Sequence, residues 1–124
     1  MKISEVAQRT GLTPDTLRFY ERIRLIPPPP RDAGGRRDYD AAALDWIAFL
    51  VRLNATGMKQ ADRIRYAALR QRGDGTAAER RRMIEAHRET VRGQIALLTE
   101  TLGFLDAKIE TYHRIEADHD RHAS

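Results

Sequence analysis

Apolar residues recur at alternating intervals of four and three positions through the second half of this chain. They form two columns with a seven-residue period, Ile84, Val91, Leu98, Leu105 and Tyr112 in one and Ile95, Leu102 and Ile109 in the other. Such a heptad pattern is typical of a coiled coil, and a single helix cannot cover this stripe by itself. The pattern predicts a helix over residues 76–112 that pairs with a second copy in an antiparallel coiled coil. Folding back onto the rest of the chain is the alternative.

The chain has 124 residues, the size of one ordinary domain. We expect a globular part over 1–72, a break at the Arg72–Gly75 turn, a dimerisation helix over 76–114 and a disordered tail over 115–124. Hydrophobic residues make up 41% of the chain, and no stretch approaches the length of a membrane span. The N-terminus shows no signal-peptide pattern, so we expect a soluble, cytoplasmic protein without a membrane partner.

The first 22 residues are predicted to form two short helices joined by a tight turn. Ser4 is a candidate cap for the first helix, and Gly11 is placed to end it in a left-handed conformation. Thr13 can cap the second helix, Pro14 suits its first position, and Asp15 places a negative charge at the positive end of the helix dipole. Two helices joined in this way form a helix-turn-helix, which also occurs in proteins that never bind DNA.

A proline-rich segment follows the second helix. Four consecutive prolines over 27–30 forbid a helix, and Gly34–Gly35 suits a hairpin turn between two short strands. Arg31, Arg36 and Arg37 lie around this turn with little apolar surface to bury. The segment is therefore either a basic wing that lies on a phosphate backbone or a solvated loop.

Two more helices complete the first part of the chain, one from Asp40 to Gly57 and one from about Lys59 to Arg70. Residues 1–75 hold 14 of the 22 Lys and Arg residues but only 9 of the 18 Asp and Glu residues. This excess of positive charge is expected of a part that faces a polyanion, although many ordinary solvated surfaces reach the same charge.

The composition argues against several kinds of chemistry. The chain has no cysteine, which excludes disulfides, thiolate metal sites and thiol redox reactions. Its four histidines are scattered, and no nucleophile with a base, paired carboxylates or phosphate-binding glycine loop can be recognised. We therefore expect no catalytic residues, no metal site and no cofactor.

Three segments together resemble the winged helix-turn-helix signature of MerR-type regulators: residues 3–7 (ISEVA), 11–21 (GLTPDTLRFYE) and 36–39 (RRDY). The run Leu17–Glu21 and the Gly57–Met58 junction are the most specific parts, and the resemblance covers about residues 1–70. It implies a fold dominated by α-helices, with a winged helix-turn-helix domain followed by a long dimerisation helix.

The resemblance also implies roles for matching residues. Thr13 would lie at the start of the recognition helix, Arg18 would reach a phosphate or a base edge in the major groove, and Tyr20 would contact the backbone or pack beneath the helix. The implied DNA-contacting set is Ser4, Thr13, Asp15, Thr16, Arg18, Phe19, Tyr20, Arg31, Arg36, Arg37, Tyr39 and Lys59. Within it, Tyr39 would brace the wing with its hydroxyl near a phosphate, and Ser4 and Lys59 lie beside helix N-termini.

MerR-type dimers act on promoters whose −35 and −10 elements are too far apart for the polymerase. The resemblance implies that a homodimer binds a palindromic operator in double-stranded promoter DNA, distorts the spacer and realigns the two elements for RNA polymerase. Residues 46–58 and 101–109 look closest to a compact subgroup with aldehyde- and electrophile-responsive members. This chain has Arg52 where those members carry their sensing cysteine, so an effector is left unidentified.

Other members depart further from this chain. Sensors that bind metal through cysteines are excluded, and only 12 residues follow Tyr112, so we expect no large ligand domain. An architectural or excisionase-like DNA-binding protein, which can share the winged fold, is the alternative function. Such proteins usually lack a long dimerisation helix.

Overall fold

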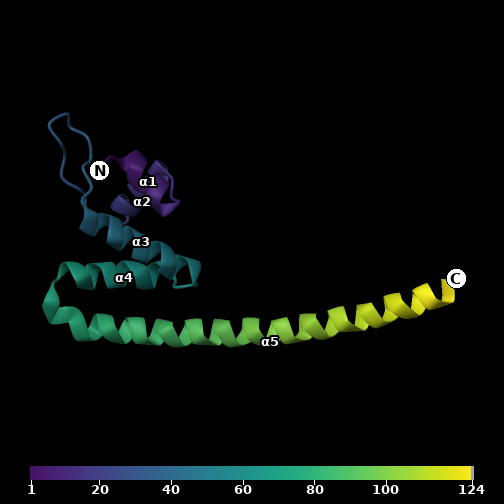
Figure 1. Ribbon diagram of the computed structural model, residues 1–124. Helices are drawn as coiled ribbons and strands as arrows, with labels where there is room; N and C mark the ends of the chain where they lie inside the picture. Colours follow the sequence, from purple (N-terminus) through teal and green to yellow (C-terminus); the bar gives the residue numbers. More distant parts are fainter. Residues whose placement is uncertain (124) are drawn as a thin grey trace. The chain divides into compact units, whose positions relative to one another are not determined.

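The computed structural model describes residues 1–123, and in this range the protein consists of helices and connecting loops. The elements are α1 (Ile3–Thr10), α2 (Pro14–Arg22), α3 (Ala41–Ala55), α4 (Gln60–Gln71), the short 3-10 helix η1 (Asp74–Thr76) and α5 (Ala77–Ala123) (Figure 1). The predicted α-helical class is confirmed. No helix in the described range is both long enough and apolar enough to cross a membrane.

The corner between α1 and α2 forms as its capping residues predict. Gly11 ends α1 with φ 76°, and its N–H donates to the Ala7 carbonyl over 3.0 Å. The Thr13 hydroxyl accepts a hydrogen bond from the Thr16 N–H over 3.1 Å, and Pro14 occupies the first helical position. The prediction that Ser4 caps α1 was wrong. Lys2 is the N-cap, because Ile3 already adopts helical geometry, so Ser4 lies inside the first turn.

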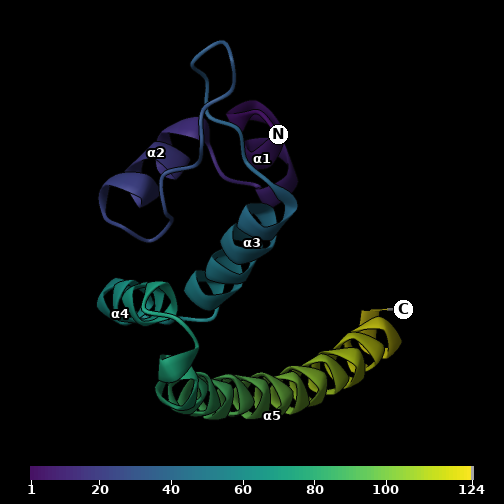
Figure 2. The same cartoon turned by 90° about the vertical axis from the view of Figure 1, so that its left-hand side faces the viewer.

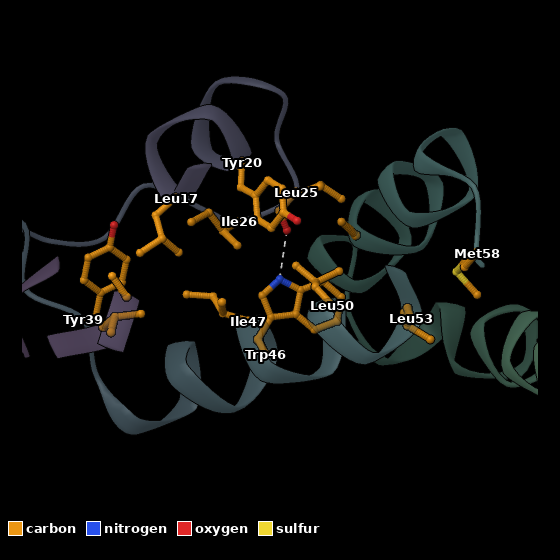
Figure 3. Close-up of a cluster of buried hydrophobic side chains, with 13 residues drawn as sticks. Leu17, Tyr20, Leu25, Ile26, Tyr39, Trp46, Ile47, Leu50, Leu53 and Met58 are labelled. Atoms are coloured by element: carbon orange, nitrogen blue, oxygen red, sulfur yellow. Dashed lines mark hydrogen bonds between the residues drawn. The ribbon is translucent and has the colours of Figure 1, made fainter. Parts of the chain in front are cut away.

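Helix α3 supplies the centre of the hydrophobic core. Figures 1 and 2 show α3 between the α1–α2 pair and α4. Its buried residues Trp46, Ile47, Leu50 and Leu53 pack with residues of the other elements, including Val6, Ala7, Leu17, Tyr20, Leu25, Ile26, Tyr39, Met58 and Ala67 (Figure 3). The indole N–H of Trp46 donates to the Leu25 carbonyl over 2.9 Å and so satisfies the one polar atom of that ring. This core holds the two helices of the corner against α3.

The loop between α2 and α3 projects from the helices as a narrow ribbon (Figures 1 and 2). The expected pair of short strands is reduced to a single antiparallel bridge between Arg31 and Arg37. Prolines 27–30 have no N–H to donate, so the ladder cannot continue toward α2. The turn is closed by Asp32, whose carboxylate accepts hydrogen bonds from the N–H groups of Gly34 (2.9 Å) and Arg36 (3.0 Å). Gly35 takes the left-handed conformation, with φ 78°.

The last helix is longer than the sequence analysis expected. Instead of ending near residue 112 and giving way to a disordered tail over 115–124, α5 continues to Ala123; Ser124 lies outside the described residues. No proline or glycine follows Gly103, and the Arg, Glu and Ala residues beyond Tyr112 are good helix formers.

The chain divides into two compact units, Met1–Ile84 and a second that begins at Glu85. The break therefore falls inside α5 and not in the Arg72–Gly75 turn. Ile84 accounts for this position, because it packs against the hydrophobic core and ties the start of α5 to the first unit.

Candidate nucleic-acid interface

The open side of α2 carries charged side chains that the sequence analysis assigned to DNA. Arg18 and Asp15 form an ion pair with 2.9 Å between Nη1 and Oδ1, and both side chains are exposed. The hydroxyls of Thr13 and Thr16 bond to each other over 2.9 Å and fix the first turn of the helix. An exposed ion pair is worth about 0–1 kcal/mol, so Arg18 can exchange Asp15 for another anion at little cost.

The two aromatic residues of α2 point in different directions. Tyr20 is buried in the core, whereas Phe19 is 37% exposed, and the Arg22 guanidinium lies 5.8 Å from its ring centre. Tyr20 therefore takes the second of the two roles considered for it and packs beneath the helix. Phe19 is the aromatic side chain of α2 that an external partner can reach.

The three wing arginines are held in different ways. Arg31 donates through Nη1 to the Gly35 carbonyl over 2.9 Å and braces the turn. Arg37 donates through Nε to Glu21 of α2 over 2.8 Å, with both side chains largely buried. Arg36 is exposed, and its side chain forms no hydrogen bond or ion pair within residues 1–123. Arg37 thus joins the wing to α2, and Arg36 is free to bind an anion.

Tyr39 lies at the base of the wing, and its position differs from the expected one. The residue is 2% exposed, and its hydroxyl is buried without a hydrogen-bond partner in the described chain. Burial raises the pKa of this hydroxyl, and the negative charge of Glu21 raises it further, against the lowering effect of three nearby arginines. A buried hydroxyl cannot reach a phosphate in this conformation, so Tyr39 supports the wing from within the core.

The structure brings five of the twelve predicted contact residues, Ser4, Arg18, Arg31, Arg36 and Arg37, together around one recess. Its volume is about 340 Å³, and it is lined by Lys2, Ile3, Ser4, Arg18, Arg31, Gly35, Arg36 and Arg37. Five of these side chains are cationic and none is a carboxylate. The recess also lies at the N-terminal end of α1, where helix N–H groups favour an anion. This combination suits the phosphates of a nucleic acid.

Lys2 is the lining cation that the sequence analysis missed. In the structure it is the N-cap of α1, a position that the sequence analysis gave to Ser4, so the available signal was only a basic residue next to the first predicted helix. Lys59 is not part of the recess; it is the exposed N-cap of α4, without a side-chain cap of its own. Within residues 1–123, no three His, Asp or Glu side chains are grouped so that they could hold a metal ion.

The predicted dimerisation residues divide between the two units. Ile84 is partly buried in the core of the first unit and so is not open to a partner in the way the sequence analysis expected. Val91 is partly exposed, and the predicted interface side chains beyond it are more than half exposed: Ile95, Leu98, Leu102, Leu105, Ile109 and Tyr112. Leu97, Phe104 and Ile115 are equally exposed but lie outside the two heptad columns, which is why the sequence analysis passed over them.

Comparison with known proteins places these features in context. Residues 2–39, which include both helices of the corner and the wing, match the model of the MerR family regulatory proteins. The HTH-type transcriptional regulator AdhR of Bacillus subtilis is 39% identical over 89 residues, which span 72% of this chain and 64% of AdhR. An HTH-type transcriptional regulator of Haemophilus influenzae is 34% identical over 114 residues, which span 92% of this chain and 84% of that protein.

A solved structure shares nearly the whole architecture. The crystal structure of HiNmlR, a MerR family regulator lacking the sensor domain, bound to promoter DNA, is 34% identical and superposes with a TM-score of 0.84. The match covers 94% of this chain and 92% of HiNmlR. The similarity therefore includes the long helix as well as the helix-turn-helix and its wing.

Proposed function

Because the chain belongs to the MerR family of DNA-binding transcriptional regulators, we propose that it binds a palindromic promoter operator as a homodimer and distorts the spacer between the −35 and −10 elements. RNA polymerase at that promoter is the expected second partner. The proposed role needs no catalytic activity, and it places the protein in the cytoplasm with the DNA.

The recess beside α1 carries the DNA-binding part of this proposal. Arg18 of the recognition helix and Arg36 of the wing line the same recess, although they are 18 positions apart in the sequence. One DNA backbone can therefore contact both while the exposed side of α2 meets the base edges of the major groove. HiNmlR, which is bound to promoter DNA in its crystal structure, supports this use of the fold.

The exposed stripe of α5 supports the homodimer. Side chains such as Leu98, Leu102 and Leu105 leave more than half of their surface in water, which disfavours an isolated helix. A second copy offers the same two columns, and an antiparallel arrangement buries both stripes along their length. Two DNA-binding domains in one particle are what a palindromic operator requires.

Distortion of the spacer follows from contacts at the two half-sites. Energy gained at both ends can offset the cost of bending and untwisting base pairs that the protein does not touch, a cost of order 1–6 kcal/mol for bending a site of this kind. The wing and the recognition helix supply the end contacts, and the paired α5 helices would set their separation.

The first experiment is the selection of bound fragments from genomic DNA, with Arg18→Ala as the control. We expect an inverted repeat between widely spaced promoter elements, enriched by the wild type and not by the variant. The recovered promoter is then transcribed with its spacer intact or shortened to the length that the polymerase prefers. Dependence on the protein should be lost with the short spacer. Equal dependence on both spacers would contradict distortion, and the absence of any enriched repeat would contradict specific operator binding.

A further inference from the structure

A second recess, away from the basic one, lies where α2 and α4 both end. Its volume is about 730 Å³, within the range of about 300–1,000 Å³ that is usual for small-molecule sites. Apolar side chains form most of its lining: Ile23, Ile26, Pro27, Pro28, Ile64 and Ala68. All of them belong to the first unit, and none was assigned a role in DNA binding.

The rim of this groove is positively charged. Arg22, Arg24 and Arg72 line it together with one carboxylate, Glu21, whose charge is already paired with Arg37 over 2.8 Å. The C-terminal ends of the two helices each contribute roughly half a negative charge. Three guanidinium groups exceed that contribution, so the groove combines an apolar floor with an excess of positive charge at its edge.

Arg24 adopts a backbone conformation that is unusual for a residue with a side chain. It is the only non-glycine residue in the described chain with a positive φ, 64°, and it follows the C-cap of α2, where glycine is the favoured residue. An L-residue pays of order 1 kcal/mol for this geometry. Yet the Arg24 side chain forms no hydrogen bond or ion pair within residues 1–123, and the same holds for the side chain of Arg72. The backbone conformation itself is held by the turn, in which the N–H of Arg24 donates to the Glu21 carbonyl over 3.2 Å and the N–H of Leu25 donates to the Tyr20 carbonyl over 2.9 Å. The guanidinium groups of Arg24 and Arg72 are thus available to an anion at the rim of the groove.

We propose that this groove is a binding site for a small amphipathic carboxylate, whose apolar body lies on Ile26 and Ile64 and whose carboxylate is bound by Arg24 and Arg72. A guanidinium group binds a carboxylate with two parallel hydrogen bonds, and the open rim leaves room for a head group in that position. The apolar floor would exclude water from the ligand's body. Neither Arg24 nor Arg72 belongs to the proposed operator contacts.

The test uses decanoate as the probe, with decanol and acetate as matched controls that lack the charge or the apolar body. Amide signals of the intact protein are followed by two-dimensional NMR below the concentration at which decanoate forms micelles. We expect shifts at Ile23, Ile26, Ile64 and Ala68, with decanoate bound at least about tenfold more tightly than decanol, since a single hydrogen-bonded charge pair already gives that difference. Acetate should leave these signals unchanged.

Variants then separate the site from the fold. Arg24→Gln should weaken decanoate binding about tenfold, whereas Arg52→Gln, the same charge change on an exposed part of α3, should not alter it. Ala68→Trp should fill the groove and abolish the shifts. Arg24→Gly should weaken decanoate binding and at the same time raise Tm, because glycine relieves the positive φ.

Several results would overturn the proposal. Equal affinity for decanoate and decanol would remove the role of the arginines, and shifts confined to α5 would place the ligand on the apolar stripe. A fall in Tm for Arg24→Gly would show that Arg24 stabilises the chain itself. Signals of the groove that respond to dilution of the protein and not to decanoate would assign the groove to a second copy. Operator affinity, measured separately, decides the proposed function, so the two proposals can fail independently.

Discussion

The two units of this chain differ in where they place their apolar side chains. The first unit buries Leu17, Leu25, Ile47 and Leu50 almost completely. In α5 no residue is buried, and its large apolar side chains beyond Glu85 are open to solvent. A unit with its own core can hold its structure as a single copy, whereas a helix without one depends on what covers it. In the proposed function, DNA contact and assembly would therefore depend on separate parts of the chain.

The largest effect is expected from substitutions that prevent the apolar stripe of α5 from pairing with a second copy. Leu98→Asp combined with Leu102→Asp places four carboxylates in the seam of the proposed dimer and should weaken association by at least about 1,000-fold, because burial of each leucine is worth about 1.5–3 kcal/mol. Analytical ultracentrifugation measures this. Leu97→Asp combined with Phe104→Asp is the matched control, since both residues are exposed but lie outside the heptad columns. A dimer that survives the first pair and dissociates with the second would place the interface on the other side of α5.

The next largest effect is expected from a substitution in the DNA-contacting part of the first unit. Arg18→Ala should lower operator affinity by about 10–100-fold, the value of a lost bidentate base contact or its phosphate equivalent, and should leave the dimer intact. Fluorescence anisotropy with operator DNA and sedimentation provide the two measurements. Arg9→Ala is the control, because Arg9 also forms an exposed ion pair, with Glu5 of α1 over 2.9 Å, and lies outside the recess. Equal losses for both variants would indicate a general charge effect.

A smaller effect concerns the wing. Arg36→Gln should reduce operator affinity only several-fold at low salt, but it should also make the slope of log affinity against log salt shallower by about 2 for the dimer, one phosphate contact for each copy. Arg52→Gln, on α3 and outside the recess, should leave the slope unchanged. An unaltered slope for Arg36→Gln would mean that this free guanidinium does not bind phosphate.

The smallest effect tests the interior of the first unit. Tyr39→Phe removes a buried hydroxyl without a partner and should raise the free energy of unfolding by about 1 kcal/mol near neutral pH. The pKa of Tyr39 is raised in the folded state, so folding favours the protonated phenol. The wild type should therefore lose stability as the pH rises from 10, the usual Tyr pKa, toward the higher pKa of the folded state. The Tyr39→Phe variant should not show this pH-dependent loss of stability. Urea unfolding at several pH values measures both.

The same variant bears on the role expected of this hydroxyl from the family resemblance. Because the Tyr39 hydroxyl is buried, operator affinity should not change in Tyr39→Phe. A clear loss of affinity would show that the wing opens on DNA and that the hydroxyl reaches a phosphate after all.

The parts of the fold that follow from local chemistry could be predicted from the sequence. Thr13 and Pro14 begin α2, and Gly11 ends α1, because each acts on its own few neighbours. The seven-residue period of the apolar residues also predicts the long helix, but it does not predict where the helix ends, because the residues beyond Tyr112 are polar and yet good helix formers. The wing strands were overestimated, since the prolines that shape the segment also remove the N–H groups of a ladder.

Tertiary contacts explain most of what the sequence did not reveal. The ion pair between Arg37 and Glu21 joins residues 16 positions apart, and no local sequence pattern predicts it. The family resemblance implies a phosphate contact for the Tyr39 hydroxyl, yet packing against the core buries this residue. The positive φ of Arg24 could not be predicted for a different reason: glycine is the residue that usually indicates such a turn, and this position holds an arginine.

The separation of the two units also has a genetic consequence. In the proposed homodimer, a copy with Arg18→Ala keeps its pairing stripe and can still join a wild-type copy. Such mixed dimers would hold only one competent half-site reader, so an excess of the variant should silence the wild type when both are expressed in the same cell. A copy with the Leu98→Asp and Leu102→Asp changes cannot pair and should be recessive. The position of a mutation along the chain, before or after Glu85, would thus determine whether it is dominant.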